Sequence, residues 1–257
     1  MQFYDVHCHI VKSYFRKNLD AFLSQWVDKG LIKVVSMAMK YSESAKNIEL
    51  SKNYKQIIPG IGIHPWKAKK PLNEDIKNQF VDLLSLTNKA VVIGEIGLDY
   101  HFIKIQERYP YQKQFFNFFL ELAEQFSLPV SLHLKGAEKE GAEILTSFDL
   151  KPAQVLIHWY SGPIDVLKEF QQRGYFFSVN PSVLTASTHV RVVELVPMEQ
   201  LLTESDGDVK YTIDNRRIIG SPDLIPEIIN KIAHVKKLPQ DIVVETLLNN
   251  AKSYLML

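Results

Sequence analysis

The chain has 257 residues, of which 46% are hydrophobic and 23% are charged, enough for one large α/β domain or two small ones. Its net charge of +1 gives no overall field that would attract a nucleic acid or a membrane, although a local basic rim would still hold phosphates. The chain has a single cysteine, Cys8, so it forms no internal disulfide. It shows no secretory signal and no apolar run near the ~20 residues that span a bilayer. We therefore expect a cytoplasmic protein.

Short apolar runs alternate along the chain with longer amphipathic segments. The short runs predict eight strands, over Phe3–Ile10, Lys33–Ala38, Ile57–Ile63, Ala90–Ile96, Pro129–Leu134, Gln154–His158, Tyr175–Val179 and Gln200–Thr203. The longer segments predict helices over Asn18–Lys29, Ser42–Asn53, Asn73–Leu86, Tyr109–Phe126, Ala137–Phe148, Pro163–Arg173, His189–Val196, Leu224–Lys236 and Gln240–Leu257. Apolar residues at helical spacing support the first and the fourth, and Ser42–Asn53 is a polar helix. We expect Asn73 to cap its helix and Gly174 to end another in the left-handed conformation.

The alternation of eight strands with helices predicts the fold. It matches a (β/α)₈ barrel of the TIM type, whose usual length is ~250 residues. No linker divides the chain, so we expect one domain over residues 1–257. A doubly wound open sheet is the alternative, but that fold requires no eightfold count. The chain has neither a Gly-x-Gly-x-x-Gly motif nor a P-loop, so it carries no nucleotide-binding fingerprint.

The first predicted strand contains a His-x-His motif. Alternation places Asp5, His7 and His9 on one face and the intervening apolar residues, Val6, Cys8 and Ile10, on the other. Imidazoles two residues apart on a strand are close enough to hold one divalent ion from one side. The motif is short enough to arise by chance, so by itself a plain pair of strand histidines explains it equally well. We expect Asp5 to orient an imidazole rather than to bind metal.

Further polar residues fall at the carboxyl ends of other predicted strands: His64, Glu95, His133, His158, Glu204 and Asp206. The carboxyl ends of barrel strands meet at one mouth, where catalytic groups collect. Glu95 lies between apolar neighbours and glycines, where an unpaired charge is costly and a metal ion would offset that cost. The pattern therefore predicts a metal site at the C-terminal mouth of the barrel.

Ordinary structural roles remain open for several of these residues. His64 and Asp206 would also serve as turn caps, and His133 and His158 as core histidines bonded to backbone. Surface positions are expected for three other histidines, His101, His189 and His234. The lysines after His64 are expected to be solvated, and for Arg216 and Arg217 solvation and phosphate binding are equally good explanations.

Several motifs occur in order along the chain: Asp5-x-His7-x-His9, Gly62-Ile63-His64-Pro65, Gly94-Glu95-Ile96-Gly97-Leu98-Asp99-Tyr100, Pro129-Val130-x-x-His133, His158-x-x-Ser161-Gly162 and Glu204-Ser205-Asp206. Together they resemble the TatD family of metal-dependent deoxyribonucleases, over almost the whole chain. The resemblance implies a TIM-like barrel of the amidohydrolase kind with two divalent ions, such as Zn, Mg or Mn. It assigns one ion to His7, His9, Glu95 and Asp206. It assigns the other to Glu95, His133 and His158, with Glu95 bridging.

The resemblance also implies a reaction. His64 and Glu204 match residues that line the substrate site of such enzymes. The expected activity is that of a phosphodiesterase or deoxyribonuclease, similar to a 3′–5′ exonuclease, in which a metal-bound hydroxide attacks the phosphorus. Asp206 is the carboxylate best placed to accept the proton of that water. Lys135, Arg216 and Arg217 are candidates to offset charge on the phosphate oxygens.

The loops that would face the substrate depart from the family pattern. They contain Lys135-Gly136-Ala137, Trp159-Tyr160 and the segment Gly207–Arg217. The substrate therefore stays open between DNA, RNA and a small phosphodiester. An amide or lactone substrate on the same barrel is an alternative, less favoured because related enzymes bridge their metals with a carbamylated lysine where this chain has Glu95. A third hypothesis is a subunit of a larger assembly, with Trp159-Tyr160 or Tyr100–Tyr111 binding a protein partner.

Overall fold

The computed structural model describes residues 1–87 and 91–257. Eight strands form one sheet in which each strand is hydrogen-bonded to the next along the chain, and all of these pairs are parallel. The strands are β1 (Phe3–Cys8), β2 (Leu31–Ser36), β3 (Ile57–Ile61), β4 (Val92–Asp99), β5 (Val130–Lys135), β6 (Val155–Ile157), β7 (Phe176–Val179) and β8 (Leu201–Thr203). Each of the predicted strands is thus present. The fourth was predicted to begin at residue 90, which lies outside the described residues.

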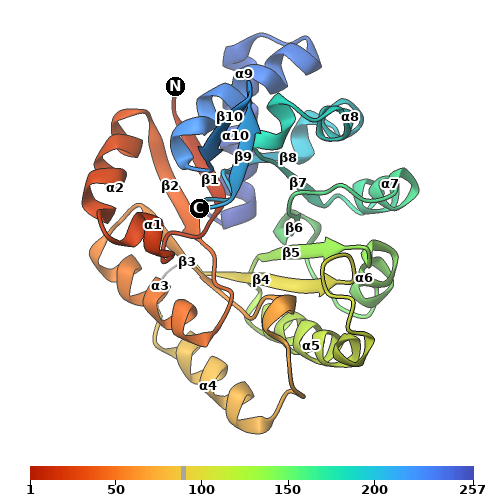
Figure 1. The fold of residues 1–257 in the computed structure, drawn as a ribbon. Helices are drawn as coiled ribbons and strands as arrows, with labels where there is room; N and C mark the ends of the chain where they lie inside the picture. Colours follow the sequence, from red (N-terminus) through yellow and green to blue (C-terminus); the bar gives the residue numbers. More distant parts are fainter. Residues whose placement is uncertain (88–90) are drawn as a thin grey trace.

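Helices follow the strands and lie outside the sheet (Figure 1). They are α1 (Ser13–Arg16), α2 (Leu19–Asp28), α3 (Tyr41–Asn53), α4 (Glu74–Ser85), α5 (Tyr109–Phe126), α6 (Glu138–Leu145), α7 (Ile164–Gln172), α8 (Ser187–Leu195), α9 (Ile225–Lys236) and α10 (Gln240–Leu255). The side chain of Asn73 accepts a hydrogen bond from the backbone N–H of Ile76, and Gly174 has φ +78° after α7. Both predicted helix ends are therefore confirmed.

The sheet curls until its first and last strands meet. The hydroxyl of Thr203 on β8 donates to the carbonyl of Tyr4 on β1 at 2.9 Å, and the N–H of Asp206 donates to the carbonyl of His7 at 2.9 Å. These bonds join the two edges of the sheet and produce a nearly closed barrel. The predicted (β/α)₈ barrel is confirmed, and the open doubly wound sheet is not observed in the described residues.

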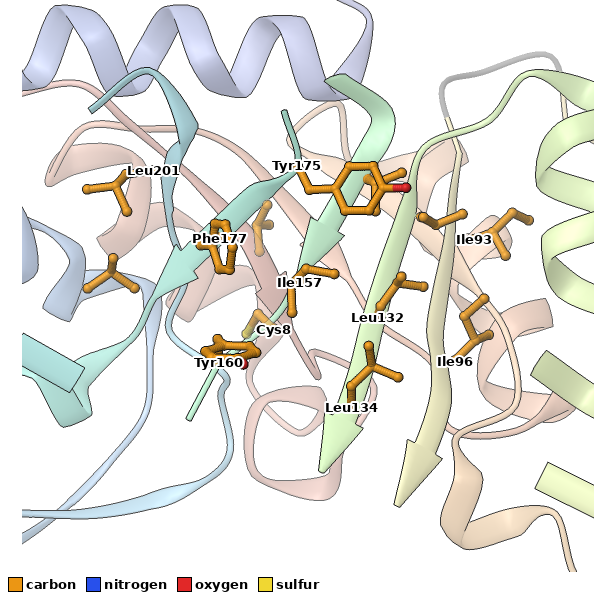
Figure 2. Close-up of a cluster of buried hydrophobic side chains, with 14 of the residues drawn as sticks. Cys8, Ile93, Ile96, Leu132, Leu134, Ile157, Tyr160, Tyr175, Phe177 and Leu201 are labelled. Atoms are coloured by element: carbon orange, nitrogen blue, oxygen red, sulfur yellow. The ribbon is translucent and has the colours of Figure 1, made fainter. Parts of the chain in front are cut away.

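Two hydrophobic clusters stabilise this arrangement. The larger one fills the layer between the strands and the surrounding helices, and Figure 2 shows members such as Leu132 and Leu134 on β5 beside Ile96 on β4. The smaller one joins side chains of the strands to the end of α10. Tyr254 of α10 is fully buried, and its hydroxyl donates to the carbonyl of Val130 at the start of β5. The last helix therefore covers the N-terminal ends of the strands, opposite the mouth that was predicted to hold the site.

The first strand departs from simple alternation. Its pairing with β2 is irregular between Asp5 and Cys8. Val6 consequently belongs to the smaller cluster with Tyr254, whereas Cys8 and Ile10 belong to the larger one. The expectation that these three apolar residues share one layer was wrong, because an irregular strand shifts the faces of the residues that follow.

Two elements were not expected from the sequence. One is the short helix α1, and the other is an antiparallel hairpin of β9 (Lys210–Ile213) and β10 (Arg216–Ile219) after the last barrel strand. Asp214 and Asn215 form its turn with φ values of 49° and 61°. Left-handed conformations at both central positions suit a tight hairpin turn. Among the described residues, no helix is both long and apolar enough to cross a membrane.

Candidate active site

The carboxyl ends of the barrel strands surround one cavity of about 750 Å³. Its lining includes most of the residues that the sequence singled out at strand ends: His9, His64, Glu95, His133, His158 and Asp206. His7 lies directly beneath them, fully buried, with its ring stacked on that of His158 at 3.9 Å between centroids. The convergence predicted from the strand ends is therefore what the fold produces.

Glu95 lies at the centre of this group, and one of its oxygens faces the first strand. Its Oε2 is 3.5 Å from Nε2 of His7 and 3.3 Å from Nε2 of His9. The same two nitrogens lie 3.7 and 3.6 Å from Oδ1 of Asp206. Two imidazoles and two carboxylates thus point at a common centre. They are the residues that the family resemblance assigns to one ion.

The other oxygen of Glu95 faces a second set of imidazoles. Its Oε1 is 2.9 Å from Nδ1 of His133, 3.2 Å from Nε2 of His64 and 3.4 Å from Nε2 of His158. The resemblance assigns His133 and His158 to the second ion, and the structure adds His64 to the same set. Glu95, His64 and His133 have ligand atoms within 4.8 Å of one another, as a metal site requires.

Three buried polar side chains contact the imidazoles at the ring nitrogens that do not face Glu95. Ser131 Oγ is 3.0 Å from Nδ1 of His7, and Glu204 Oε1 is 3.0 Å from Nδ1 of His158. Asp99 Oδ2 is 3.0 Å from Nε2 of His133. A fixed partner on one ring nitrogen sets the tautomer and the orientation of the other. Asp99 was not singled out by the sequence, although it ends the strand that carries Glu95.

The charges of the site depend on one another. Burial alone would raise the pKa of Glu95, but the imidazoles of His64 and His7 and a hydrogen bond to His133 hold that pKa well below its ordinary value. Burial lowers the pKa of His64 to about 4. For His158, burial is outweighed by Glu204, and its pKa lies well above the ordinary value. The neighbouring imidazoles therefore favour the ionised form of Glu95, and Glu204 favours the protonated form of His158.

Asp206 follows β8, lies beside His7 and completes the site. Its backbone has φ +43°, a left-handed conformation that Asp and Asn adopt more readily than most residues. Burial raises its pKa, against the opposing effect of His158 and His7. A buried carboxylate with a raised pKa is a stronger base than an exposed one, which suits Asp206 to accept a proton.

Asp5 does not behave as expected. Its Oδ1 accepts hydrogen bonds from the N–H groups of His7 and Ser205, each at 3.1 Å, so it holds backbone rather than an imidazole. Its other oxygen is buried without a hydrogen-bond partner among the described residues. Burial raises the pKa of Asp5 to about 8. The irregularity of β1 is the reason, because it removes Asp5 from the face of His9.

The residues expected to contact substrate do not all lie at the cavity. Lys135 lines the cavity, where its Nζ donates to the carbonyl of Trp159 at 3.1 Å, and burial lowers its pKa. Glu204 is fully buried behind His158 and lies outside the described lining of the cavity. Arg216 and Arg217 are exposed on β10, also outside that lining. Of these four side chains, only Lys135 is brought to the cavity.

Other lining residues were missed by sequence reasoning. His101 and His189 line the cavity, so the expectation of an uninvolved surface position was wrong for both, whereas His234 is exposed on α9. Lys12 and Trp66 line it as well. Each of these residues lies in the connection that follows a strand or on the helix after it, and the loops beyond strand ends form the mouth of a barrel. The position of these residues soon after a predicted strand was therefore the signal by which the sequence could have identified them.

Comparison with known proteins gives the family. A family model described as TatD related DNase matches residues 4–256. The chain belongs to the TatD family. The prediction of a TatD-type metal-dependent hydrolase, made from motifs at the strand ends, is thereby confirmed.

Individual relatives agree with this assignment over nearly their whole length. The chain is 28% identical to an uncharacterized metal-dependent hydrolase of Methanocaldococcus jannaschii, covering 97% of this chain and 95% of that protein. It is 27% identical to the deoxyribonuclease TATDN3 of Homo sapiens, covering 96% and 92%. The crystal structure of YJJV, a TatD homolog from Escherichia coli, superposes with a TM-score of 0.88 at 25% identity, covering 99% and 98%.

Proposed function

We propose that this TatD-family hydrolase is a phosphodiesterase that cleaves nucleic acid with two divalent ions held on either side of Glu95. The observation that carries the proposal is the division of Glu95: one carboxylate oxygen faces His7, His9 and Asp206, and the other faces three further imidazoles. The name of the human relative, a deoxyribonuclease, supports nucleic acid as the substrate.

The residues present fit divalent metal ions. Nε2 of His7 is fully buried and has no hydrogen-bond partner among the described residues, although it points toward Glu95 and Asp206. An unpaired buried polar atom is costly, and a metal ion would satisfy it. Imidazole nitrogen and carboxylate oxygen are ligands that zinc and similar divalent ions accept readily.

One ion would be held by His7, His9, Asp206 and Oε2 of Glu95. The other would be held by Oε1 of Glu95 with His133 and His158, and His64 faces the same oxygen at 3.2 Å. Bound there, the ions would lower the pKa of a water molecule and polarise the phosphoryl oxygens of the substrate. Because His64 faces the same oxygen of Glu95 as the ligands of the second ion, it would lie beside that ion and contact the substrate.

The remaining groups position ligands or handle charge. Asp206, whose pKa burial raises, would accept a proton from the attacking water. Lys135 lines the cavity and would offset negative charge on a nonbridging phosphate oxygen. Glu204 and Asp99 act through His158 and His133, which they contact from behind. Arg216 and Arg217 are exposed outside the cavity lining, where they would contact only a longer nucleic-acid substrate.

The test combines metal analysis with defined substrates. Purified protein should bind two equivalents of Zn²⁺ or Mn²⁺, and the loaded enzyme should cleave DNA or RNA strands labelled at one end. His7→Ala should abolish that cleavage. A panel of amides and lactones, assayed in parallel, examines the alternative bonds. Protein that binds no metal, or a His7→Ala variant with full phosphodiesterase activity, would contradict the proposal.

Strands labelled at the 5′ end and at the 3′ end answer a further question about the same reaction. Shortening from one end by single nucleotides indicates an exonuclease and gives its direction. Cuts at internal positions indicate an endonuclease. Sizing of the loaded protein alone and with candidate partners examines the hypothesis of a larger assembly.

A further inference from the structure

Two exposed aromatic rings stand at the rim of the cavity. Trp66 is 38% exposed and Phe102 is 60% exposed, and both line the cavity. Their ring centroids are 5.6 Å apart and their planes meet at 75°. The two rings therefore form an open corner, which we call the aromatic corner. Large aromatic side chains left exposed beside a site often take part in binding.

The aromatic corner is tied to the proposed metal site by one carboxylate. Asp99 is fully buried, and its Oδ2 accepts a hydrogen bond from the indole N–H of Trp66 at 2.6 Å while facing Nε2 of His133 at 3.0 Å. Its Oδ1 accepts from the backbone N–H groups of Phe102 at 2.7 Å and His101 at 3.0 Å. Asp99 thus fixes the indole of Trp66 and the backbone of Phe102 relative to a proposed metal ligand.

A second set of contacts holds Trp66 against the imidazoles. The backbone N–H of Trp66 donates to Nδ1 of His64 at 3.1 Å, and its indole ring lies 5.0 Å from the ring of His64. The guanidinium of Arg108 donates to the carbonyl of Trp66 at 2.7 Å. Trp66 is therefore held in place by several contacts, and it stands immediately beside the imidazoles that face Oε1 of Glu95.

The other indole in the cavity is already engaged. The N–H of Trp159 points to Nε2 of His189 at 3.3 Å, and Nζ of Lys135 lies 5.3 Å from the centre of its ring. The ring of Tyr211 packs against it at 5.8 Å. Among the described lining residues, Trp66 and Phe102 are therefore the exposed indole and phenyl rings, and the exposed imidazole of His101 packs edge-on against Phe102 with ring centroids 4.6 Å apart.

We propose that the aromatic corner is a stacking subsite for a nucleobase of the substrate, adjacent to the phosphate that is cleaved. This inference rests on the proposed phosphodiesterase function and adds the part of the substrate that the enzyme grips. Rigid aromatic rings bind a planar base with little loss of conformational entropy. The cavity of about 750 Å³ is larger than a phosphate group needs, and Lys12 and Lys135 line it as cations for the phosphate.

The test compares a strand with bases and a strand without them. We would measure kcat/KM for oligodeoxyadenylate and for an equally long strand of tetrahydrofuran abasic units, which have the same kind of phosphodiester backbone. Phe102→Ala should lower the ratio of the two values about 5- to 100-fold, the range expected for loss of one base–aromatic stack. Ile105→Ala is the matched control, because Ile105 is 55% exposed in the same loop and lies outside the described cavity lining.

A binding measurement separates failure of the subsite from failure of the proposed reaction. In metal-free protein, deoxyadenosine monophosphate should quench tryptophan fluorescence and deoxyribose 5-phosphate should not, and Phe102→Ala should weaken the nucleotide at least about 5-fold. Parent protein that cleaves neither strand would contradict the phosphodiesterase, while the quenching would still decide the subsite. An unchanged kcat/KM ratio together with equal affinity of parent and Phe102→Ala would overturn the stacking subsite.

Discussion

Glu95 shows how much of the site depends on one side chain. Its two oxygens face different imidazoles, so a substitution there changes both proposed ion sites at once. The residues behind the imidazoles offer finer tests, because each acts on one ring only. Glu204 contacts His158, Asp99 contacts His133 and Ser131 contacts His7.

Glu204→Gln tests the support of one imidazole. The amide keeps the size of the side chain but removes the charge that holds His158, so the affinity for one divalent ion should fall about 10- to 100-fold. Isothermal titration with Zn²⁺ or Mn²⁺ measures this change. Glu227→Gln, at an exposed glutamate of α9, is the control and should bind both ions like the parent. Equal affinities in the two variants would show that Glu204 does not position His158.

Asp206→Asn tests the proposed proton acceptor. Asn tolerates the left-handed backbone at this position, so the loop should keep its shape. The value of kcat should fall about 10²- to 10⁴-fold, as expected for loss of a general base. Burial raises the pKa of Asp206, which means that its charge is held at a cost, so the thermal midpoint of metal-free protein should not decrease. Cleavage at the parent rate would rule out this role.

At the scale of elements, α10 is the helix that closes the bottom of the barrel. Tyr254 lies against Phe176 of β7 and donates to the carbonyl of Val130 on β5, so a single side chain connects the last helix to two strands. It lies among strand residues of the smaller cluster, away from the cavity lining. Its contribution should therefore be to stability.

Substitutions of Tyr254 divide that contribution into two parts. Tyr254→Phe removes one buried hydrogen bond and should lower the free energy of unfolding by about 1 kcal/mol or somewhat more. Tyr254→Ala also removes the ring and should cost about 3–5 kcal/mol. Urea denaturation of metal-free protein measures both. A Phe variant with lower metal affinity, at unchanged stability, would contradict the separation of this helix from the site.

Regular elements were predictable because their cause is local. Short apolar runs and apolar residues at helical spacing specify the strands and helices, and the convergence of side chains at strand ends follows from the barrel itself. The irregularity of β1 has no such signal, since it arises from pairing with β2, and it placed Val6 and Asp5 wrongly. The hairpin did carry a signal that was missed: Asp214-Asn215, directly after the β-branched pair Thr212-Ile213, suits a tight turn.

Contacts within the site were harder to predict than its location. That His64 and Glu95 occur near strand ends is visible in the sequence, but the division of imidazoles between two oxygens depends on side-chain rotamers. For Arg216, which follows the last barrel strand, the sequence left solvation and phosphate binding equally open. The hairpin carries it outward to the surface. The number of residues between the last barrel strand and Arg216 does not show in which direction the hairpin carries the side chain.

At the scale of the whole molecule, the proposed ions should couple binding to stability and to pH. An ion that binds only the folded chain raises the free energy of unfolding with its concentration. It must displace a proton from any ligand that is protonated, and the pKa of His158 lies well above its ordinary value. The raised pKa stabilises metal-free protein at low pH, and this contribution is lost as pH rises through it.

Metal-induced stabilisation should therefore grow with pH. The difference in thermal midpoint between protein with excess Zn²⁺ and protein with chelator should be larger at about pH 8 than at about pH 6, because protons compete less for the imidazoles. Differential scanning calorimetry at fixed free metal measures it. A difference that stays constant, or decreases with rising pH, would contradict binding through these histidines.

The seam between β1 and β8 has a consequence for synthesis of the chain. His7 and Asp206 are joined there by a backbone hydrogen bond, although 199 residues separate them. Until the ribosome has synthesised β8, the edge of β1 that β8 will contact has no partner. An unpaired strand edge readily pairs with another chain. The same late event that closes the sheet brings the last carboxylate to the histidines. Nascent chains that stop before this point should therefore be both inactive and prone to associate.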